Sequence, residues 1–356
     1  MKIGARILKT GIAIILALTI SQLSPYSSPA FAGIAAIFAM QPTIYRSYRT
    51  VIEQIQGNVI GAVIAILFVI AFGNHAFFVG LACMLTIMIN VKLKTQNTVT
   101  LAVVTVIAIM ESQSGNFFDF ALYRFSSVML GILSAFVVNL LFLPPKYETK
   151  LYHKITSLFD DITKWIRISS RNNSEHAHIK NEISNLKEQM LRIEQLYLMY
   201  KEEKELFKRD NYTKARKLVV YRQMVVTTKK ALDILKKLNK YENQYLHSPY
   251  EFQLAIRSQI DYLMVQHEHI HLKYIRKTRT TVTFENDEGM EHEELLALFM
   301  DMTREYEKEN NAYLYHMMSL LSSLIEYEEN IRHLDTLISS FLSFHKDDDE
   351  MKLETS

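Results

Sequence analysis

Residues 41–53 read QPTIYRSYRTVIE, and residues 57–61 continue this stretch with GNVIG. With Arg46, Arg49 and Glu53, it is the densest cluster of charge in an apolar block that runs from the N-terminus to Leu143. Charge inside such a block is costly unless it lies at a membrane surface, faces the interior of a helix bundle or is paired. We therefore expect a cytoplasmic turn between two membrane helices, the mouth of a space that the helices enclose, or both.

The charged residues divide the chain into two parts. Few lie in residues 1–143: the bases are Lys2, Arg6, Lys9, Arg46, Arg49, Lys92, Lys94 and Arg124, and the acids are Glu53, Glu111 and Asp119. Most of the 40 Lys and Arg residues and of the 38 Asp and Glu residues follow. This contrast predicts a membrane domain over residues 1–145, a cytoplasmic helical domain over 146–346 and an acidic tail over 347–356. The net charge of +2 and the lack of a basic stripe give no case for a nucleic-acid partner.

Six apolar segments predict six membrane-spanning helices, since one span needs roughly 20 residues. They cover about residues 7–23, 28–43, 54–73, 76–92, 96–111 and 120–143. The second and fifth reach this length only if their polar ends are included. The expected fold class is therefore all-α, with a six-helix transmembrane bundle followed by a cytoplasmic bundle of long helices.

Basic residues occupy alternate connections between these segments, as cytoplasmic loops require. They precede the first segment and follow the second, fourth and sixth, the last with Lys146 and Lys150. Arg124 is the exception, at the outer end of the sixth. The pattern predicts that both termini are cytoplasmic in a cell-membrane protein. The competing interpretation, a signal peptide cut after Ala32, would destroy the second segment and this alternation.

Small residues recur four apart in two of the segments. Gly57 and Gly61 open the third, and Gly131 and Ala135 lie in the sixth. This spacing lets helix backbones approach closely, so ordinary helix packing is expected. The alternative is that these residues line a substrate path.

The turn motif Pro-Thr-x-Tyr-Arg, followed by an acidic residue and Gly-Asn-x-x-Gly at the start of the third segment, resembles the aromatic acid exporter family. That family is related to the fusaric acid resistance transporters, and the match covers about residues 1–145. The helical remainder is similar to the C-terminal domain of the family's bacterial branch. The resemblance implies efflux of aromatic or other organic carboxylates from the cytoplasm. Because larger members carry a duplicated membrane unit, it also implies a homo-oligomer.

The second part of the chain is expected to form about four to five long antiparallel helices after Pro144 and Pro145. Apolar residues recur at spacings of three and four over residues 179–200 and from about Pro249 to Tyr274. The same rhythm predicts one further helix over residues 291–344.

On a helix, the side chains of Arg46, Arg49 and Glu53 share one side. One interpretation is a surface anchor that contains an Arg49–Glu53 pair. The other is that Arg46 or Arg49 receives a substrate carboxylate, whose shape the planar guanidinium matches. Asn58, one turn further on, would add a polar contact. Membrane lipid and a small organic anion are thus the expected partners.

The remaining polar clusters favour structural roles. Glu111, Asp119 and Arg124 are expected to be solvated loop residues, with an exit gate or a proton-responsive carboxylate as the alternative. His267 and His271 share a helical face while His269 points away, so no metal site is predicted. The chain contains no phosphate-binding loop, dinucleotide motif or catalytic motif, so neither a cofactor nor an enzyme is expected. A membrane-anchored helical scaffold or sensor is the alternative to an exporter.

Overall fold

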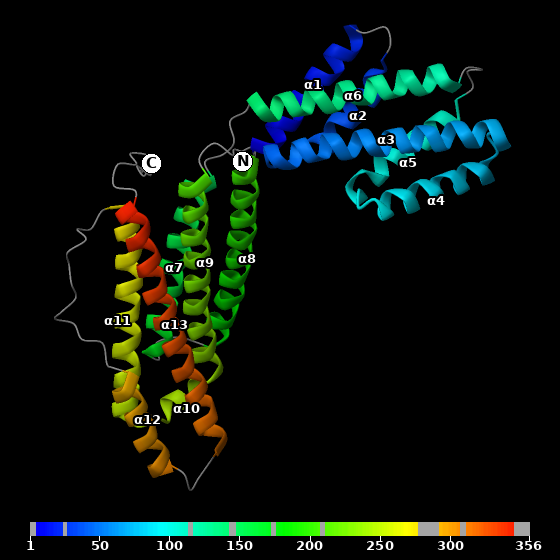
Figure 1. The fold of residues 1–356 in the computed structure, drawn as a ribbon. Coiled ribbons are helices and arrows are strands. Elements are labelled where there is room, and N and C mark those ends of the chain that lie inside the picture. Colours follow the sequence, from blue (N-terminus) through cyan, green and yellow to red (C-terminus); the bar gives the residue numbers. More distant parts are fainter. Residues whose placement is uncertain are drawn as a thin grey trace. The chain divides into compact units, whose positions relative to one another are not determined.

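The computed structural model describes residues 5–23, 27–112, 117–141, 147–171, 176–206, 211–276, 292–306 and 311–344. Every regular element within these ranges is a helix (Figure 1). The chain divides into two compact units, Met1–Pro145 and Lys146–Ser356. The predicted acidic tail lies outside the described residues.

Each of the six apolar segments forms a helix. The helices of the first unit are α1 (Ala5–Leu23), α2 (Pro29–Ala39), α3 (Ile44–Phe72), α4 (Ala76–Lys92), α5 (Val99–Met110) and α6 (Phe117–Leu141), with a short 3₁₀ turn η1 (Gln96–Thr98) before α5. Among the described residues, only Ile44–Phe72 and Phe118–Leu141 are both long and apolar enough to cross a membrane. The other four are shorter apolar helices.

The charged stretch belongs to helix α3, so the turn before it is shorter than expected. Helix α2 ends at Ala39 and α3 already begins at Ile44. The Thr43 hydroxyl accepts a hydrogen bond from the amide of Arg46 (3.2 Å), which caps the new helix. From α6, the Asn139 side-chain amide lies 3.2 Å and 3.3 Å from the carbonyl oxygens of Gln41 and Thr43. A cap and a long-range amide contact thus position the turn.

Close backbone contacts hold the first unit together, with α2 packed on α6 and α3 on α5. At Gly131 on α6, an added Cβ atom would lie 2.1 Å from the carbonyl oxygen of Ala32 on α2. At Gly61 on α3, it would lie 2.8 Å from the carbonyl oxygen of Ala102 on α5. Ala135 is fully buried. Both crossings depend on the missing side chain, as in closely packed membrane helices.

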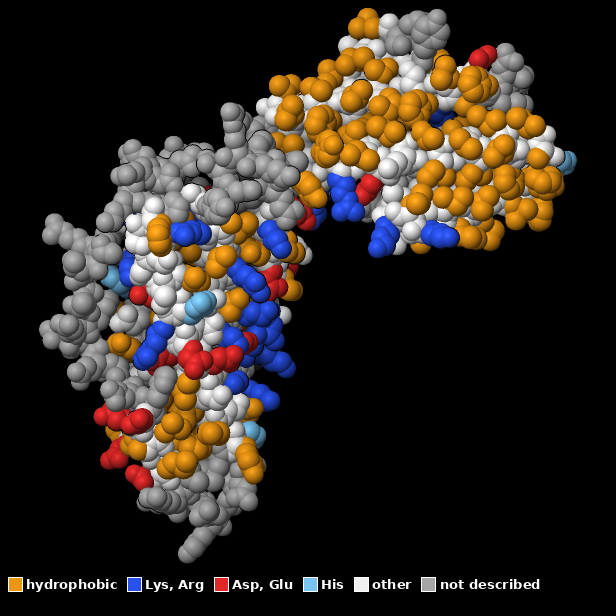
Figure 2. All heavy atoms as spheres, viewed as in Figure 1, with side chains coloured by type: hydrophobic (Ala, Val, Ile, Leu, Met, Phe, Trp, Pro, Cys, Tyr) orange, Lys and Arg blue, Asp and Glu red, His pale blue; other side chains and the backbone are white. Residues whose placement is uncertain are grey.

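The outward faces of the first unit are apolar. Exposed residues on α3 and α4 include Val59, Val63, Leu67, Ile70, Phe77, Met84 and Met88. Figure 2 shows this unit covered largely by hydrophobic side chains on the visible face, with most of the Lys and Arg there along one edge. An exposed apolar surface of this extent is typical of contact with lipid or another protein.

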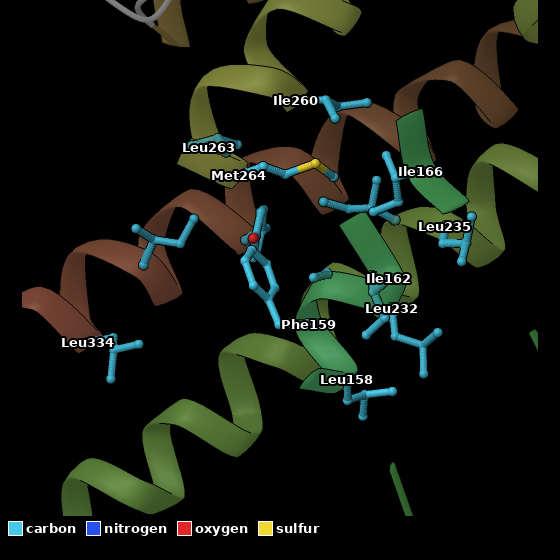
Figure 3. Close-up of a cluster of buried hydrophobic side chains, with 14 of the residues drawn as sticks. Leu158, Phe159, Ile162, Ile166, Leu232, Leu235, Ile260, Leu263, Met264 and Leu334 are labelled. Carbon is cyan, nitrogen blue, oxygen red and sulfur yellow. The ribbon is translucent and has the colours of Figure 1, made fainter. Parts of the chain in front are cut away.

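The second unit contains five long helices and two shorter ones within its described residues. These are α7 (Tyr147–Ser170), α8 (His176–Leu206), α9 (Asn211–Lys240), α10 (Glu242–Leu246), α11 (Tyr250–Tyr274), α12 (His292–Tyr306) and α13 (Asn311–Phe344). Helix α9 packs against α7, α8 and α13, and α11 packs on α13. Figure 3 shows apolar side chains of α7, α9, α11 and α13 meeting in the core, among them Phe159, Leu232, Leu263 and Leu334.

The prediction of a single helix over residues 291–344 was wrong, because the structure has α12 and α13 there. Both helices turn apolar residues to one core, where Leu295 and Phe299 of α12 and Met317 and Leu320 of α13 are buried. The apolar rhythm therefore continues across two elements, and periodicity alone did not separate them.

Candidate functional site

The first turns of α3 contain the charged residues Arg46, Arg49 and Glu53. Arg46 is half-buried, Arg49 is exposed and Glu53 is buried. The Nε atom of Arg49 donates to Oε1 of Glu53 over 2.6 Å, an ion pair between residues four apart on the helix. The carboxylate that points inward thus meets a guanidinium at the protein surface.

A buried polar stripe runs along α3 on both sides of Glu53. It consists of Ser47, Thr50, Gln54 and Asn58. The Asn58 side-chain amide donates to the Gln54 carbonyl oxygen (2.9 Å), and its Oδ1 accepts from the Thr105 hydroxyl of α5 (2.7 Å). Asn58 therefore joins α3 to α5. Within the described residues, Ser47 Oγ and Gln54 Oε1 are buried without a hydrogen-bond partner.

A second set of polar side chains faces α3 from the end of α4 and from η1. The hydroxyl of Thr95 lies 3.0 Å from both oxygens of Asn90, and the Asn90 amide donates to the Thr86 carbonyl oxygen (2.9 Å). Gly57 allows α3 to approach this wall, because a Cβ atom there would lie 2.9 Å from Oγ1 of Thr98. Together with the stripe on α3 and Thr105, these residues form what we call the polar band. Its members are Ser47, Thr50, Gln54, Asn58, Thr86, Asn90, Thr95, Thr98 and Thr105.

Of the polar band, sequence reasoning singled out Asn58 as a candidate ligand. The contact of Asn58 with Thr105 joins two helices across 47 residues and leaves no signal in local spacing. One sign in the sequence was the spacing of Gln54 and Asn58, which are four residues apart and therefore share a face of the helix.

Arg124 differs from expectation, because it is not a solvated loop residue. It lies within α6, is 1% exposed and is among the largest fully buried side chains of the described structure. Its guanidinium carbon lies 3.9 Å from the ring centroid of Phe31 on α2, a cation–π contact. Glu111 and Asp119, by contrast, are exposed. Helix α6 begins at Phe117, seven residues before Arg124, so this charge lies within a helix and is buried.

In the second unit, His267 and His271 are buried together, with ring centroids 4.5 Å apart. His267 Nδ1 lies 2.9 Å from the Tyr327 hydroxyl, and His269 lies on a less buried face. Burial lowers the pKa of His271 to about 4, and burial together with the nearby His271 lowers the pKa of His267. The described residues contain no group of three or more His, Cys, Asp or Glu arranged to hold a metal ion.

Comparison with known proteins places this architecture in a family. The UPF0421 protein YgaE of Bacillus subtilis (strain 168) is 46% identical over 354 residues, which cover 99% of this chain and 100% of that protein. The chain belongs to the UPF0421 family. Residues 1–142 match the model named Aromatic acid exporter family member 1, which confirms the resemblance seen in the turn motif. This match to a transporter family supports a membrane location and a role in transport for the first unit.

More distant UPF0421 relatives match only part of the chain. The UPF0421 protein OB2406 of Oceanobacillus iheyensis is 31% identical over 165 residues, or 46% of this chain and 47% of that protein. The UPF0421 protein SH1063 of Staphylococcus haemolyticus is 33% identical over 159 residues, or 43% of this chain and 47% of that protein. Each alignment spans about half of the relative. The names of these UPF0421 proteins give no substrate.

Proposed function

We propose that this UPF0421 protein is a secondary transporter that exports organic carboxylates, above all aromatic ones, from the cytoplasm. In this proposal, α1 to α6 each cross the bilayer, and both termini and the second unit are cytoplasmic. The short helices α2 and α5 reach the required depth with their flanking polar turns. The alternation of basic residues among the connections supports this orientation.

One observation carries the proposal: the charged start of α3 leads directly into the polar band. Polar side chains inside a membrane bundle are costly, so they tend to mark paths for substrates or ions. Arg46 and Arg49 would receive the carboxylate at the cytoplasmic mouth, and Glu53 would hold Arg49 until an anion competes for it. Asn58 and its partners would then offer amide and hydroxyl groups one or two turns deeper.

We further propose a homo-oligomer as the working form. The membrane unit holds six apolar helices, and its outward faces expose many large apolar side chains. A second copy would cover part of these faces and enclose a path that one unit leaves open to lipid. The second unit would join subunits or gate the inner mouth.

Inside-out vesicles test the export proposal. Protein-dependent uptake of labelled benzoate and of a panel of other aromatic acids is measured with and without a proton gradient. Arg46→Gln and Arg49→Gln should raise the half-saturating concentration by roughly tenfold each, since a charged hydrogen bond of this kind is lost. Lys92→Gln, which removes an exposed cation at the end of α4, is the matched control. The absence of protein-dependent movement of every acid would refute export.

The alternative is a membrane-anchored helical scaffold or sensor. It is favoured by the internal bonding of the same residues, since Arg49 pairs with Glu53 and Asn58 bonds to Thr105. In that case Arg46→Ala and Arg49→Ala would leave cellular phenotypes intact. Removal of residues 146–356 would abolish them.

A further inference from the structure

We propose that Arg124 binds the carboxylate of the transported anion inside the membrane. It would form a second binding site, in addition to the one that Arg46 and Arg49 form at the cytoplasmic mouth. This inference rests on the proposed function. Arg124 is 1% exposed, and within the described structure its Nε and Nη1 atoms have no hydrogen-bond partner. A buried cation with unused donors is among the costliest groups that a bundle can hold, and an anionic ligand would compensate for it.

No acidic residue compensates Arg124 in the described part of this unit. Glu53 pairs with Arg49 on α3, while Glu111 and Asp119 are exposed. The described ion pairs of the chain do not include Arg124. The favourable contact that it does make is with the ring face of Phe31, which offsets only part of the cost of burial.

The neighbouring hydroxyl groups already form hydrogen bonds with backbone groups. Ser127, three residues after Arg124, donates to the Tyr123 carbonyl oxygen (2.8 Å) and accepts from the Ser28 amide (2.7 Å). The Tyr123 hydroxyl donates to the Ser27 carbonyl oxygen (2.9 Å). These bonds tie the start of α2 to α6 and fix the frame around the guanidinium. They leave the Nε and Nη1 atoms of Arg124 unpaired.

The start of α2 adds to the positive potential at this place. Phe31 lies in the first turn of α2, where the helix dipole has its positive end. Helix N-termini of this kind attract anions. Because Nε and Nη1 lie on different in-plane edges of the guanidinium, a carboxylate that arrives at either edge meets an unpaired donor. The Phe31 ring places an aromatic surface beside the guanidinium, as an aromatic acid would require.

Direct binding tests this assignment on the full chain in phosphatidylcholine nanodiscs. Benzoate is titrated by calorimetry, and benzamide, of similar shape without the charge, is the matched ligand. We expect benzoate to bind more tightly than benzamide. Arg124→Gln should weaken benzoate roughly ten- to hundredfold, as expected for lost charged hydrogen bonds. Arg124→Lys keeps the charge without the planar fork, so its affinity for benzoate should lie between those of the wild type and Arg124→Gln. Lys92→Gln should bind benzoate like the wild type.

Thermal unfolding without ligand separates a binding role from a folding role. Because Arg124→Gln removes an uncompensated buried charge, its unfolding temperature should not drop, while the stabilisation by benzoate should vanish. If Arg124→Gln does not fold, the comparison of Arg124→Lys with wild type decides. Equal affinities for benzoate in those two proteins, or in Arg124→Gln and wild type, would overturn the proposal.

Two further measurements, with an anionic lipid and of transport, separate this site from lipid binding and from the export proposal. If phosphatidylglycerol stabilises the protein through Arg124 and benzoate does not, the ligand is a lipid phosphate and the assignment is wrong. Transport is measured in parallel. Arg124-dependent binding without vesicle transport would refute export but keep the site, whereas transport with unchanged half-saturation in Arg124→Gln would refute the site but keep export.

Discussion

The hydroxyl of Thr105 on α5 lies 2.7 Å from the amide oxygen of Asn58 on α3, where both side chains are buried. The same hydroxyl lies 2.9 Å from the Leu101 carbonyl oxygen. In the interior of a membrane bundle such a bond replaces water that is not available. Asn58 and Thr105 therefore help to set the register between α3 and α5.

Thr105→Val should remove this link at nearly constant volume. We expect a loss of about 1 kcal/mol in the free energy of unfolding, as measured for hydrogen bonds between membrane helices. Equilibrium unfolding in mixed detergent micelles gives the value. Thr105→Ser keeps the hydroxyl and should recover most of the loss, and Thr100→Val, on the exposed face of α5, should have no effect. Equal losses in the Thr105 and Thr100 variants would show that the bond carries no stability.

Gly131→Ala should separate α6 from α2. The new Cβ atom would lie 2.1 Å from the Ala32 carbonyl oxygen, so one backbone has to move. We expect a cost of about 2 kcal/mol or more. Gly80→Ala on α4 is the matched control, because nothing lies within 4 Å of its Cβ position. Its higher helix propensity should leave stability equal or raise it by up to about 1 kcal/mol. The same unfolding assay compares the two, and a harmless Gly131→Ala would contradict the close crossing.

Lys217→Met should destabilise the second unit. Lys217 is buried, and its Nζ atom lies 3.1 Å from Oε1 of Glu148, whose other oxygen accepts from the Tyr200 hydroxyl (3.0 Å). The variant removes the cation and leaves the partly buried carboxylate, at a cost of about 1–3 kcal/mol. Lys229→Met breaks a more exposed pair with Glu194 and should cost less than about 1 kcal/mol. Chemical denaturation followed by the fluorescence of Trp165, the single tryptophan, measures both.

Acid should weaken the second unit through His267 and His271. Burial holds the pKa of both imidazoles below the ordinary 6.5 in the folded state, at about 4 for His271. Below pH 6.5 the unfolded chain therefore binds more protons, and stability falls as pH decreases. The slope is at most about 1.4 kcal/mol per pH unit for each histidine. Stability above pH 7 is unaffected by this pair.

Trp165 fluorescence during denaturation between pH 5 and pH 7 measures this slope. Nearer pH 4 it would be offset, because burial and the charges of Glu268 and Asp161 raise the pKa of Asp160, whose folded form then holds its proton more tightly. The double variant His267→Gln/His271→Gln should flatten the slope, whereas His153→Gln, which is exposed, should leave it unchanged. An unchanged slope in the double variant would contradict burial of the pair.

Local patterns in the sequence predicted the helices of the first unit and the family resemblance. The apolar runs predicted helices at all six positions of the first unit, because a helix forms its backbone hydrogen bonds within a single apolar segment. The turn motif at Pro42 led to the aromatic acid exporter resemblance, which the family match confirms. The rhythm from Pro249 to Tyr274 located α11, since Pro249 stands immediately before its first residue.

Contacts between elements were decided only by the tertiary structure. Arg124 has the sequence neighbourhood of a loop end, yet α6 extends past it and Phe31 covers it from another helix. Thr105 looks like an ordinary small polar residue until the fold places Asn58 beside it. The reason is physical: helix formation depends on residues three or four apart, whereas burial and pairing depend on side chains that the fold brings together from distant positions.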